Sequence, residues 1–224
     1  SPRDEARPRS AQSQDGGHNS KGSLVLETGA GEHWIGCWTR TLPVTGGQHY
    51  AFSAWRNFTN VPTPRRSVYA RVIWQDANGK PVSWEEPAKQ GYAKGSVPRA
   101  EPEYPVDPAG KPGLWAKCAS TLRAPVAAKQ AKIELYLQWA ANARVEWSDV
   151  SLTRIPAPAP RTARLATIHL QPSVGKNPAD KPPQYAPLIA EAAKQKADLV
   201  VLGETLTYYG TGKKMDECAE PVPG

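Results

Sequence analysis

The chain has 224 residues, 39% of them hydrophobic, and a formal net charge of +7 from 28 basic and 21 acidic side chains. This length fits one large domain or two small ones, and the apolar fraction suffices for a packed core, which excludes a wholly disordered chain. No run of about 18 apolar residues occurs, so we expect no membrane span. The basic residues stand singly or in pairs such as Arg65-Arg66, which favours a solvated basic surface over a nucleic-acid partner.

The first 22 residues are polar, include Gly16-Gly17 and show no apolar periodicity, so we predict a flexible arm. All eight tryptophans then fall between residues 34 and 147. Such a sharp change in composition predicts two units built on different principles.

Residues 23–155 show the pattern of an antiparallel β-sandwich, in which short strands alternate apolar and polar residues and are separated by turn signals. The expected strands cover residues 23–28, 48–55, 67–75, 80–84, 114–122, 131–140 and 144–153. Asp76-Ala77-Asn78-Gly79 predicts a hairpin turn before 80–84. The segment 85–113 holds six prolines and little periodicity, which is typical of a long functional loop.

Two of these strands separate their residues cleanly into two faces. The apolar faces, which include Trp74 and Trp139, are expected to join the core. They consist of Val68, Ala70, Val72 and Trp74 in one strand, and of Ile133, Leu135, Leu137 and Trp139 in the other.

The opposite faces carry the candidate sugar-binding residues Tyr69, Arg71, Tyr136 and Gln138. A sugar offers apolar C–H faces and many hydroxyls, so its site needs aromatic rings beside hydrogen-bonding side chains. The simpler alternative is that these four residues only cover the outside of the sheet.

Residues 156–163, which begin Pro-Ala-Pro-Ala-Pro, predict an extended linker. After it, a strand at 164–170, a helix at 183–196 and an apolar strand at 198–202 predict a β-α-β unit and so the start of an α/β domain. One such unit cannot cover both faces of its sheet, so we expect residues 164–224 to be an amino-terminal fragment of that domain.

Glu204 follows the second of these strands, at the sheet edge where α/β proteins gather ligand-binding and catalytic groups. Between apolar walls its pKa would rise and suit a general base. A helix-capping or loop glutamate is the simpler alternative.

Residues 164–224 resemble the amino-terminal part of the carbon–nitrogen hydrolases, the nitrilase and amidase superfamily. The matching segments are Arg-Leu-Ala-Thr-Ile-His-Leu-Gln-Pro, Glu-Ala-Ala-Lys-Gln-Lys-Ala-Asp and Leu-Val-Val-Leu-Gly-Glu-Thr-Leu-Thr-Tyr-Tyr-Gly. The resemblance implies an α-β-β-α sandwich and a Glu–Lys–Cys triad, with Glu204 as the general base that activates a cysteine nucleophile. Gly203 departs from the usual proline, and the family's lysine and cysteine lie further downstream than residue 224. Cys218, Lys213 and Lys214 are expected to be ordinary residues, so this segment alone should be inactive.

Three segments of the β-rich region, residues 22–27, 42–50 and 145–150, resemble jelly-roll modules of the galactose-binding and carbohydrate-binding type. We therefore predict a jelly-roll sandwich followed by the truncated start of a nitrilase-like α/β domain. The expected function is hydrolysis of a small-molecule amide or nitrile beside a sugar-binding sandwich; the alternative is a non-catalytic carbohydrate-binding protein.

We expect no cofactor and no clustered metal ligands, while a structural calcium ion in the sandwich stays an open alternative. The full-length protein is expected to form a homo-oligomer. Sugar-binding sandwiches are common in exported proteins, which favours a secreted or periplasmic location. One disulfide among Cys37, Cys118 and Cys218 is left open.

Overall fold

The computed structural model describes residues 4–83, 99–108 and 110–219. The chain divides into two compact units between Pro158 and Ala159, inside the expected linker, and we call them the sandwich unit (1–158) and the C-terminal unit (159–224). Within the described part of the chain, no helix has the length and apolar character needed to span a membrane.

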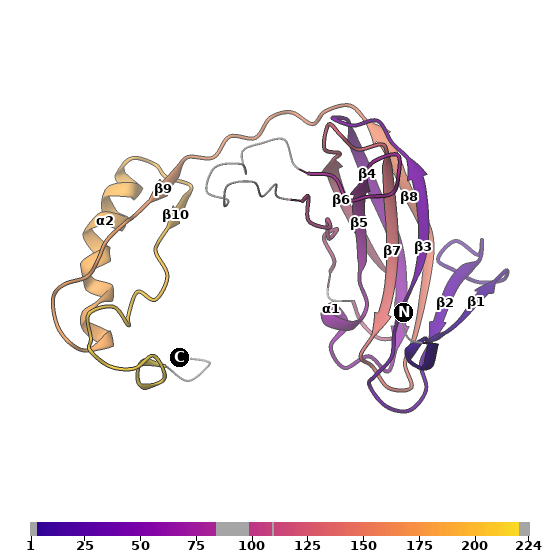
Figure 1. Ribbon diagram of the computed structural model, residues 1–224, viewed down its shortest axis with the longest axis horizontal. Helices are drawn as coiled ribbons and strands as arrows, with labels where there is room; N and C mark the ends of the chain where they lie inside the picture. The colour runs from indigo at the N-terminus through magenta and orange to yellow at the C-terminus, as the bar shows by residue number, and fades with distance from the viewer. Residues whose placement is uncertain (1–3, 84–98, 109, 220–224) are drawn as a thin grey trace. The chain divides into compact units, whose positions relative to one another are not determined.

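The sandwich unit is mainly β and has two antiparallel sheets, with strand orders β1-β2-β8-β4-β6 and β3-β7-β5 (Figure 1). The strands are β1 (Arg9–Ser13), β2 (Ser23–Glu27), β3 (Ile35–Pro43), β4 (His49–Thr59), β5 (Ala70–Gln75), β6 (Ala116–Arg123), β7 (Gln130–Gln138) and β8 (Arg144–Ile155). Two short helical turns accompany them, η1 (Asp4–Ala6) and α1 (Pro64–Ser67). From β2 to β8, consecutive strands alternate between the two sheets, so each connection passes from one sheet to the other. The prediction of a β-sandwich is confirmed.

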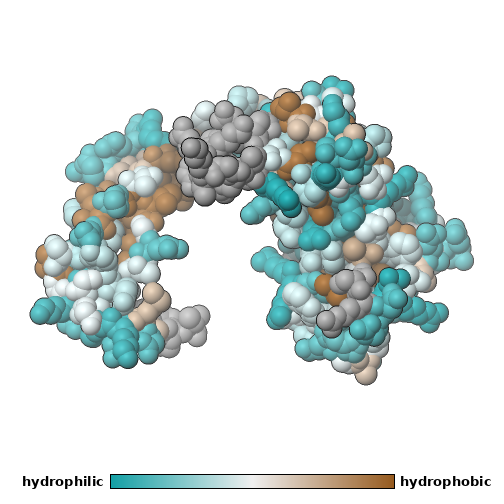
Figure 2. Space-filling model, in the orientation of Figure 1, coloured by the Kyte–Doolittle hydropathy of each residue, from teal (hydrophilic) through white to brown (hydrophobic). Residues whose placement is uncertain are grey.

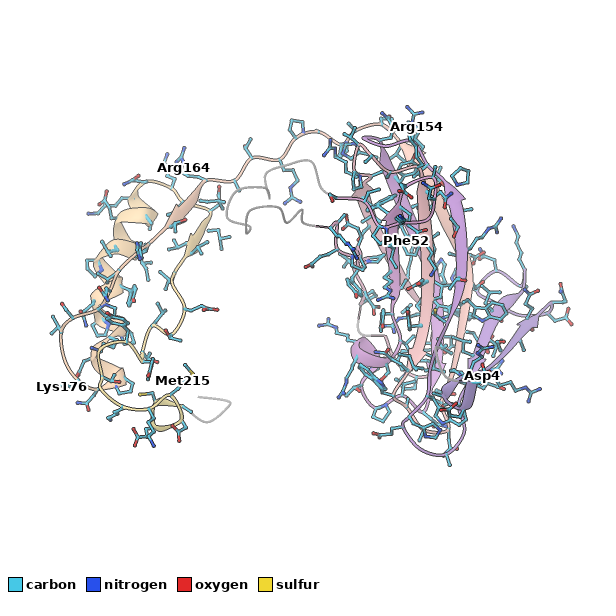
Figure 3. All side chains as sticks on the ribbon, in the orientation of Figure 1. Asp4, Phe52, Arg154, Arg164, Lys176 and Met215 are labelled. Atoms are coloured by element: carbon cyan, nitrogen blue, oxygen red, sulfur yellow. The ribbon has the colours of Figure 1, made fainter. Side chains whose placement is uncertain are left out.

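The core lies between the sheets and is filled by the inward residues of each strand. Trp74, Trp147 and Phe52 are at most 1% exposed, and Figure 3 labels Phe52 among the side chains of the sandwich unit. The period of two predicted from the sequence places the apolar face of β5 in the core, as expected. Burial of such large side chains supplies most of the stabilisation of a fold with this much β-structure.

Trp139 is not in the core, although the alternation in 131–140 predicted it there. Strand β7 ends at Gln138, and Trp139 takes a left-handed backbone conformation with φ of 52°. The period of two therefore breaks at that residue, and the indole turns outward with 43% exposed.

Two strands were missed in the sequence. Residues 9–13, expected in a flexible arm, pair with β2 as an antiparallel edge strand. Strand β3 pairs along its whole length with β7.

Residues 80–83 make two isolated bridges, from Pro81 to Gln75 and from Ser83 to Arg99, instead of a full strand. Trp84 and residues 85–98 of the expected proline-rich loop lie outside the described residues. The following segment 99–108 lies against the two sheets, through bridges from Glu103 to Val72 and from Val106 to Ala119.

Arg56 fixes this segment. Its side chain is fully buried, and its guanidinium donates to the carbonyl of Val68 (2.7 Å), to Asp107 Oδ1 (2.6 Å) and to the carbonyl of Pro108 (3.1 Å). Because a buried cation is tolerated only when its donors are paired, Arg56 and Asp107 require each other.

The C-terminal unit is a strand–helix–strand arrangement, as the sequence predicted. Strand β9 (Leu165–Thr167) pairs in parallel with β10 (Leu199–Val201), and α2 (Pro182–Lys194) lies between them in the chain (Figure 1). The remaining elements are η2 (Pro178–Asp180) and η3 (Asp216–Cys218). Tyr185 of α2 is buried and donates its hydroxyl hydrogen to the carbonyl of Leu170 (3.2 Å).

Candidate functional site

The four candidate sugar-binding residues lie together on the outer face of the three-stranded sheet. Tyr136 and Gln138 are in the central strand β7, Arg71 is in the neighbouring strand β5, and Tyr69 immediately precedes β5. The pairing register places Arg71 beside Glu134, and the amide of Tyr136 donates to the carbonyl of Tyr69 (2.9 Å). Residues paired across two strands point to the same face, so the sheet brings all four side chains into one surface.

Hydrogen bonds join these side chains into two groups, which we together call the network. Arg71 donates through Nε to Glu134 Oε2 (2.5 Å) and through Nη2 to the Tyr136 hydroxyl (2.8 Å). The Tyr136 hydroxyl donates in turn to Glu134 Oε2 (3.1 Å). The Tyr69 hydroxyl donates to Gln138 Oε1 (3.3 Å). Since each group orients the next, the network holds its polar atoms in fixed positions.

Aromatic rings form the other half of this surface. The rings of Tyr69 and Tyr136 stack with centroids 4.8 Å apart and an interplanar angle of 14°. Tyr104, from the segment pinned by Arg56, packs against Tyr69 at 5.8 Å and is 59% exposed. The surface therefore presents ring edges and phenolic hydroxyls together.

Glu134 carries the negative charge of the network. Burial alone would raise the pKa of its carboxyl group, but hydrogen bonds from Lys132 and Arg71 outweigh burial and hold the pKa below its ordinary value. Lys132 Nζ lies 2.9 Å from the carboxylate, on the side away from Tyr136 along β7. The same contact with Glu134 raises the pKa of Arg71 despite the burial of its guanidinium. Glu134 and Arg71 thus stabilise each other's charged forms.

The tyrosines and the nearby cysteine stay protonated. Burial raises the pKa of Tyr136 and, more modestly, that of Tyr69. Cys37, paired with Tyr136 across β3 and β7, also has a pKa raised by burial, which disfavours the nucleophilic thiolate. Burial, with the neighbouring Asp107 carboxylate, raises the pKa of Cys118 to about 12. All three cysteines of the chain are free.

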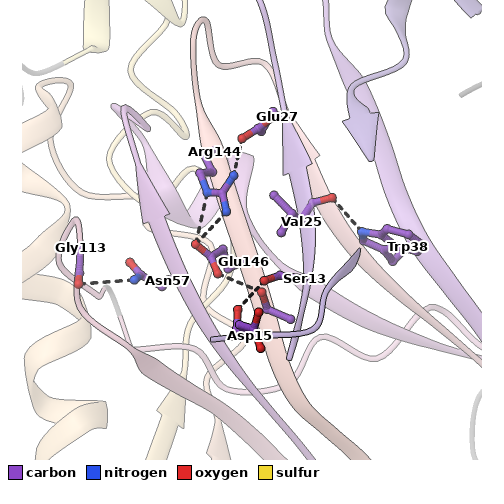
Figure 4. Close-up of polar contacts among 10 residues, drawn as sticks. Ser13, Asp15, Val25, Glu27, Trp38, Asn57, Gly113, Arg144 and Glu146 are labelled. Atoms are coloured by element: carbon purple, nitrogen blue, oxygen red, sulfur yellow. Dashed lines mark hydrogen bonds and ion pairs between the residues drawn. The ribbon is translucent and has the colours of Figure 1, made fainter. Parts of the chain in front are cut away.

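The outer face of the five-stranded sheet has a different character. Arg144 bonds to Glu27 and, through Nη2 at 3.1 Å, to Glu146, while Ser23 donates to Glu146 (2.9 Å; Figure 4). Charges that satisfy one another in this way cover a sheet face and leave few unpaired groups to offer a ligand.

Glu204 lies beyond the carboxyl end of β10, where the sequence predicted it. It borders a hollow with His169, Tyr185 and Tyr209, but its side chain is exposed. Glu204 is therefore not enclosed between apolar walls as the sequence predicted. Lys213 and Lys214 are exposed as well, and Cys218 is buried 3.7 Å from the Thr211 hydroxyl.

We call the face formed by Tyr69, Arg71, Tyr136, Gln138 and their neighbours the aromatic surface. Three of its residues were not predicted from the sequence. Glu134 and Lys132 were placed on the correct face of their strand, but only the register of β5 against β7 shows that Glu134 contacts Arg71. Tyr104 belongs to the proline-rich segment and carried no periodic signal. In residues 4–83, 99–108 and 110–219, no group of three or more His, Cys, Asp or Glu side chains could hold a metal ion.

No family model matches the chain, and no curated protein matches it. Similar solved structures include the enzymatically active domain of tailspike protein 4 of bacteriophage CBA120, at 14% identity over 66% of this chain with a TM-score of 0.48. The chain spans only 18% of that tailspike chain.

Two carbohydrate-binding modules are similar at comparable levels. A family 16 module matches at 11% identity over 65% of this chain and 86% of its own, with a TM-score of 0.44. A CBM22 xylan-binding domain from Paenibacillus barcinonensis matches at 14% identity over 67% and 83%, with a TM-score of 0.41. Nothing in these comparisons supports the resemblance to carbon–nitrogen hydrolases.

Proposed function

We propose that the sandwich unit binds carbohydrate on the outer face of the three-stranded sheet. The observation that carries this proposal is the convergence of Tyr69, Arg71, Tyr136 and Gln138 on one face, in two hydrogen-bonded groups linked by the stacked rings of Tyr69 and Tyr136. Gln138 is buried beneath this face, and the other three side chains are partly exposed. Phenolic rings provide contact area for sugar C–H groups, while guanidinium and hydroxyl groups can exchange hydrogen bonds with sugar hydroxyls. The network also keeps these groups in position before a ligand arrives, which lowers the entropic cost of binding.

Binding of the full chain to an array of polysaccharides and oligosaccharides tests this proposal. We expect binding to at least one glycan and a loss of about tenfold or more in affinity for Tyr136→Ala, since about 1.4 kcal/mol of lost contact corresponds to tenfold. Tyr136→Phe separates the ring from the hydroxyl that bonds to Arg71 and Glu134, and should lose less.

Tyr209→Ala, which removes an exposed tyrosine of the C-terminal unit, is the matched control and should bind like the unmodified chain. A flat response across the array, from a chain whose fold is intact, would contradict the proposal.

A second candidate function is the start of a carbon–nitrogen hydrolase with Glu204 as the general base. The parallel pairing of β9 with β10 and the position of Glu204 beyond β10 favour it. The coding sequence beyond Gly224 tests this candidate: it requires an open frame with a lysine at a strand end and a cysteine at a strand-to-helix turn. In that longer protein Glu204→Gln should abolish release of ammonia or amine while the fold persists. Full activity of the variant would remove Glu204 from the mechanism.

A further inference from the structure

Trp139 lies at the end of the aromatic surface and is held in an uncommon backbone conformation. Its φ of 52° is rare for a bulky residue, and such residues concentrate where a side chain must be presented for function. Its amide donates to the carbonyl of Trp34 (2.9 Å), which continues the pairing of β3 with β7 by one step. Trp139 is 43% exposed, so part of its side chain is open to solvent.

Arg66 lies over this indole, with its guanidinium carbon 4.8 Å from the ring centroid. The position is fixed by the surface itself, because Gln138 Nε2 donates to the carbonyl of Arg66 (3.1 Å) while Gln138 Oε1 accepts from Tyr69. Arg66 and Trp139 therefore extend the surface described above, joined to it through Gln138.

The charges on this surface do not cancel. Arg71 and Lys132 both bond to the single carboxylate of Glu134. Arg66 has no carboxylate within 4.0 Å among the described residues, and its side chain is exposed. Among these four described groups there are three cations and one carboxylate, and the cation that lacks an acidic partner among the described residues is the one that lies over the partly exposed indole.

We propose that Trp139 and Arg66 form a subsite for an acidic sugar, so that the ligand is a polysaccharide bearing uronic acid carboxylates. This inference rests on the proposed function. The free part of the indole contacts the sugar ring, and the guanidinium donates to the sugar carboxylate in a charge-assisted pair. The remainder of the glycan then crosses the Tyr69, Tyr136 and Arg71 surface.

Matched ligands test this directly. Glucuronoxylan, polygalacturonate and hyaluronan would each be compared, by titration calorimetry with the full chain, with the same polymer after reduction of its carboxyl groups to alcohols. The two members of each pair share their chain and linkages and differ only in charge. We expect at least one pair in which the acidic member binds about tenfold or more tightly, with a preference that shrinks as salt is added.

Two variants test whether Arg66 and Trp139 cause the preference for the acidic polymer. Arg66→Gln should remove the preference and leave binding of the reduced polymer within about twofold, whereas Trp139→Ala should weaken both members. Arg65→Gln is the matched control, because Arg65 carries the same charge one residue earlier in α1, is exposed, and makes no ring contact in the described structure.

The outcomes separate the two proposals. Equal binding of acidic and reduced polymers, or equal effects of Arg66→Gln and Arg65→Gln, would overturn the acidic subsite and leave the carbohydrate site in place. Absence of binding to every polymer of the array and of these pairs would overturn both.

Discussion

In the sandwich unit the apolar faces of the strands meet each other, whereas in the C-terminal unit they meet solvent. Leu165 of β9 and Leu199 of β10 are 62% and 55% exposed, while the core tryptophans of the sandwich are fully buried. Figure 2 shows the corresponding apolar surface on the C-terminal unit, in brown. A two-stranded sheet with one helix buries too little apolar surface to be stable by itself. The sandwich unit is rigid because each of its two sheets buries its apolar face against the other. The comparison is also the reason to look for the proposed binding surface on the sandwich unit, because precise placement of side chains needs a fixed support.

The largest expected effect is a loss of stability that is confined to the sandwich unit. Phe52→Ala removes a ring that is 1% exposed and should lower the unfolding free energy of the sandwich by about 3–5 kcal/mol. Tryptophan fluorescence in a urea titration reports it, since all eight tryptophans lie before residue 148. Hydrogen exchange of peptides from α2 should stay unchanged. A change in α2 of the same size would show that the two units unfold as one.

A smaller loss of stability is expected in the C-terminal unit, from removing the hydrogen bonds of one buried lysine. Lys181 is fully buried, and its ammonium donates to the carbonyls of Gly175 (2.7 Å), Val174 (3.3 Å) and Pro172 (3.4 Å). Lys181→Met keeps the length of the side chain and removes the donor to the carbonyls of Gly175 and Pro172, while Val174 keeps its bond from Gln184 Nε2 (2.9 Å); the expected cost is about 1.5–3 kcal/mol. Faster hydrogen exchange in α2, with unaltered tryptophan fluorescence, would bear this out. Unchanged exchange would mean that water replaces the ammonium.

The smallest expected effect depends on pH and concerns Glu134, within the proposed binding surface. The pKa of Glu134 is lowered in the folded state, so its contribution is present above the unfolded value of about 4.3 and is lost as the pH falls through the folded value. Glu134→Gln should therefore cost about 1–2 kcal/mol near neutral pH, and less in acid. Urea midpoints of both proteins across this range provide the measurement. A constant difference at every pH would contradict the role of the charge.

Much of the sandwich and of its surface could be predicted because burial on one side of a strand imposes a period of two. That rule placed Tyr69, Arg71, Tyr136 and Gln138 outward, and the structure agrees. The register could not be predicted, since β5 and β7 are separated in the chain by β6 and pair only in the folded sheet. The contact of Arg71 with Glu134 follows from that register.

The errors have local causes. Trp139 was misplaced because a left-handed residue ends the alternation, and only the backbone angle shows it. Strand β3 was missed because Gly36 and Arg40 interrupt its inward face, where Trp38 and Leu42 pack on the core. Strand β1 has the sequence Arg-Ser-Ala-Gln-Ser, which carries no apolar signal at all.

That polar strand has a role beyond its own few bonds. Strand β1 pairs with β2 from Arg9–Glu27 to Ser13–Ser23 and so occupies the edge of the five-stranded sheet. Without it, β2 would display a row of free amide and carbonyl groups beside buried Val25 and Leu26, which is the template on which chains join edge to edge into aggregates. With Arg9 and mainly exposed polar residues, β1 is an edge that discourages such joining. A chain trimmed to begin at Ser23 would keep every core residue named above and still lose solubility.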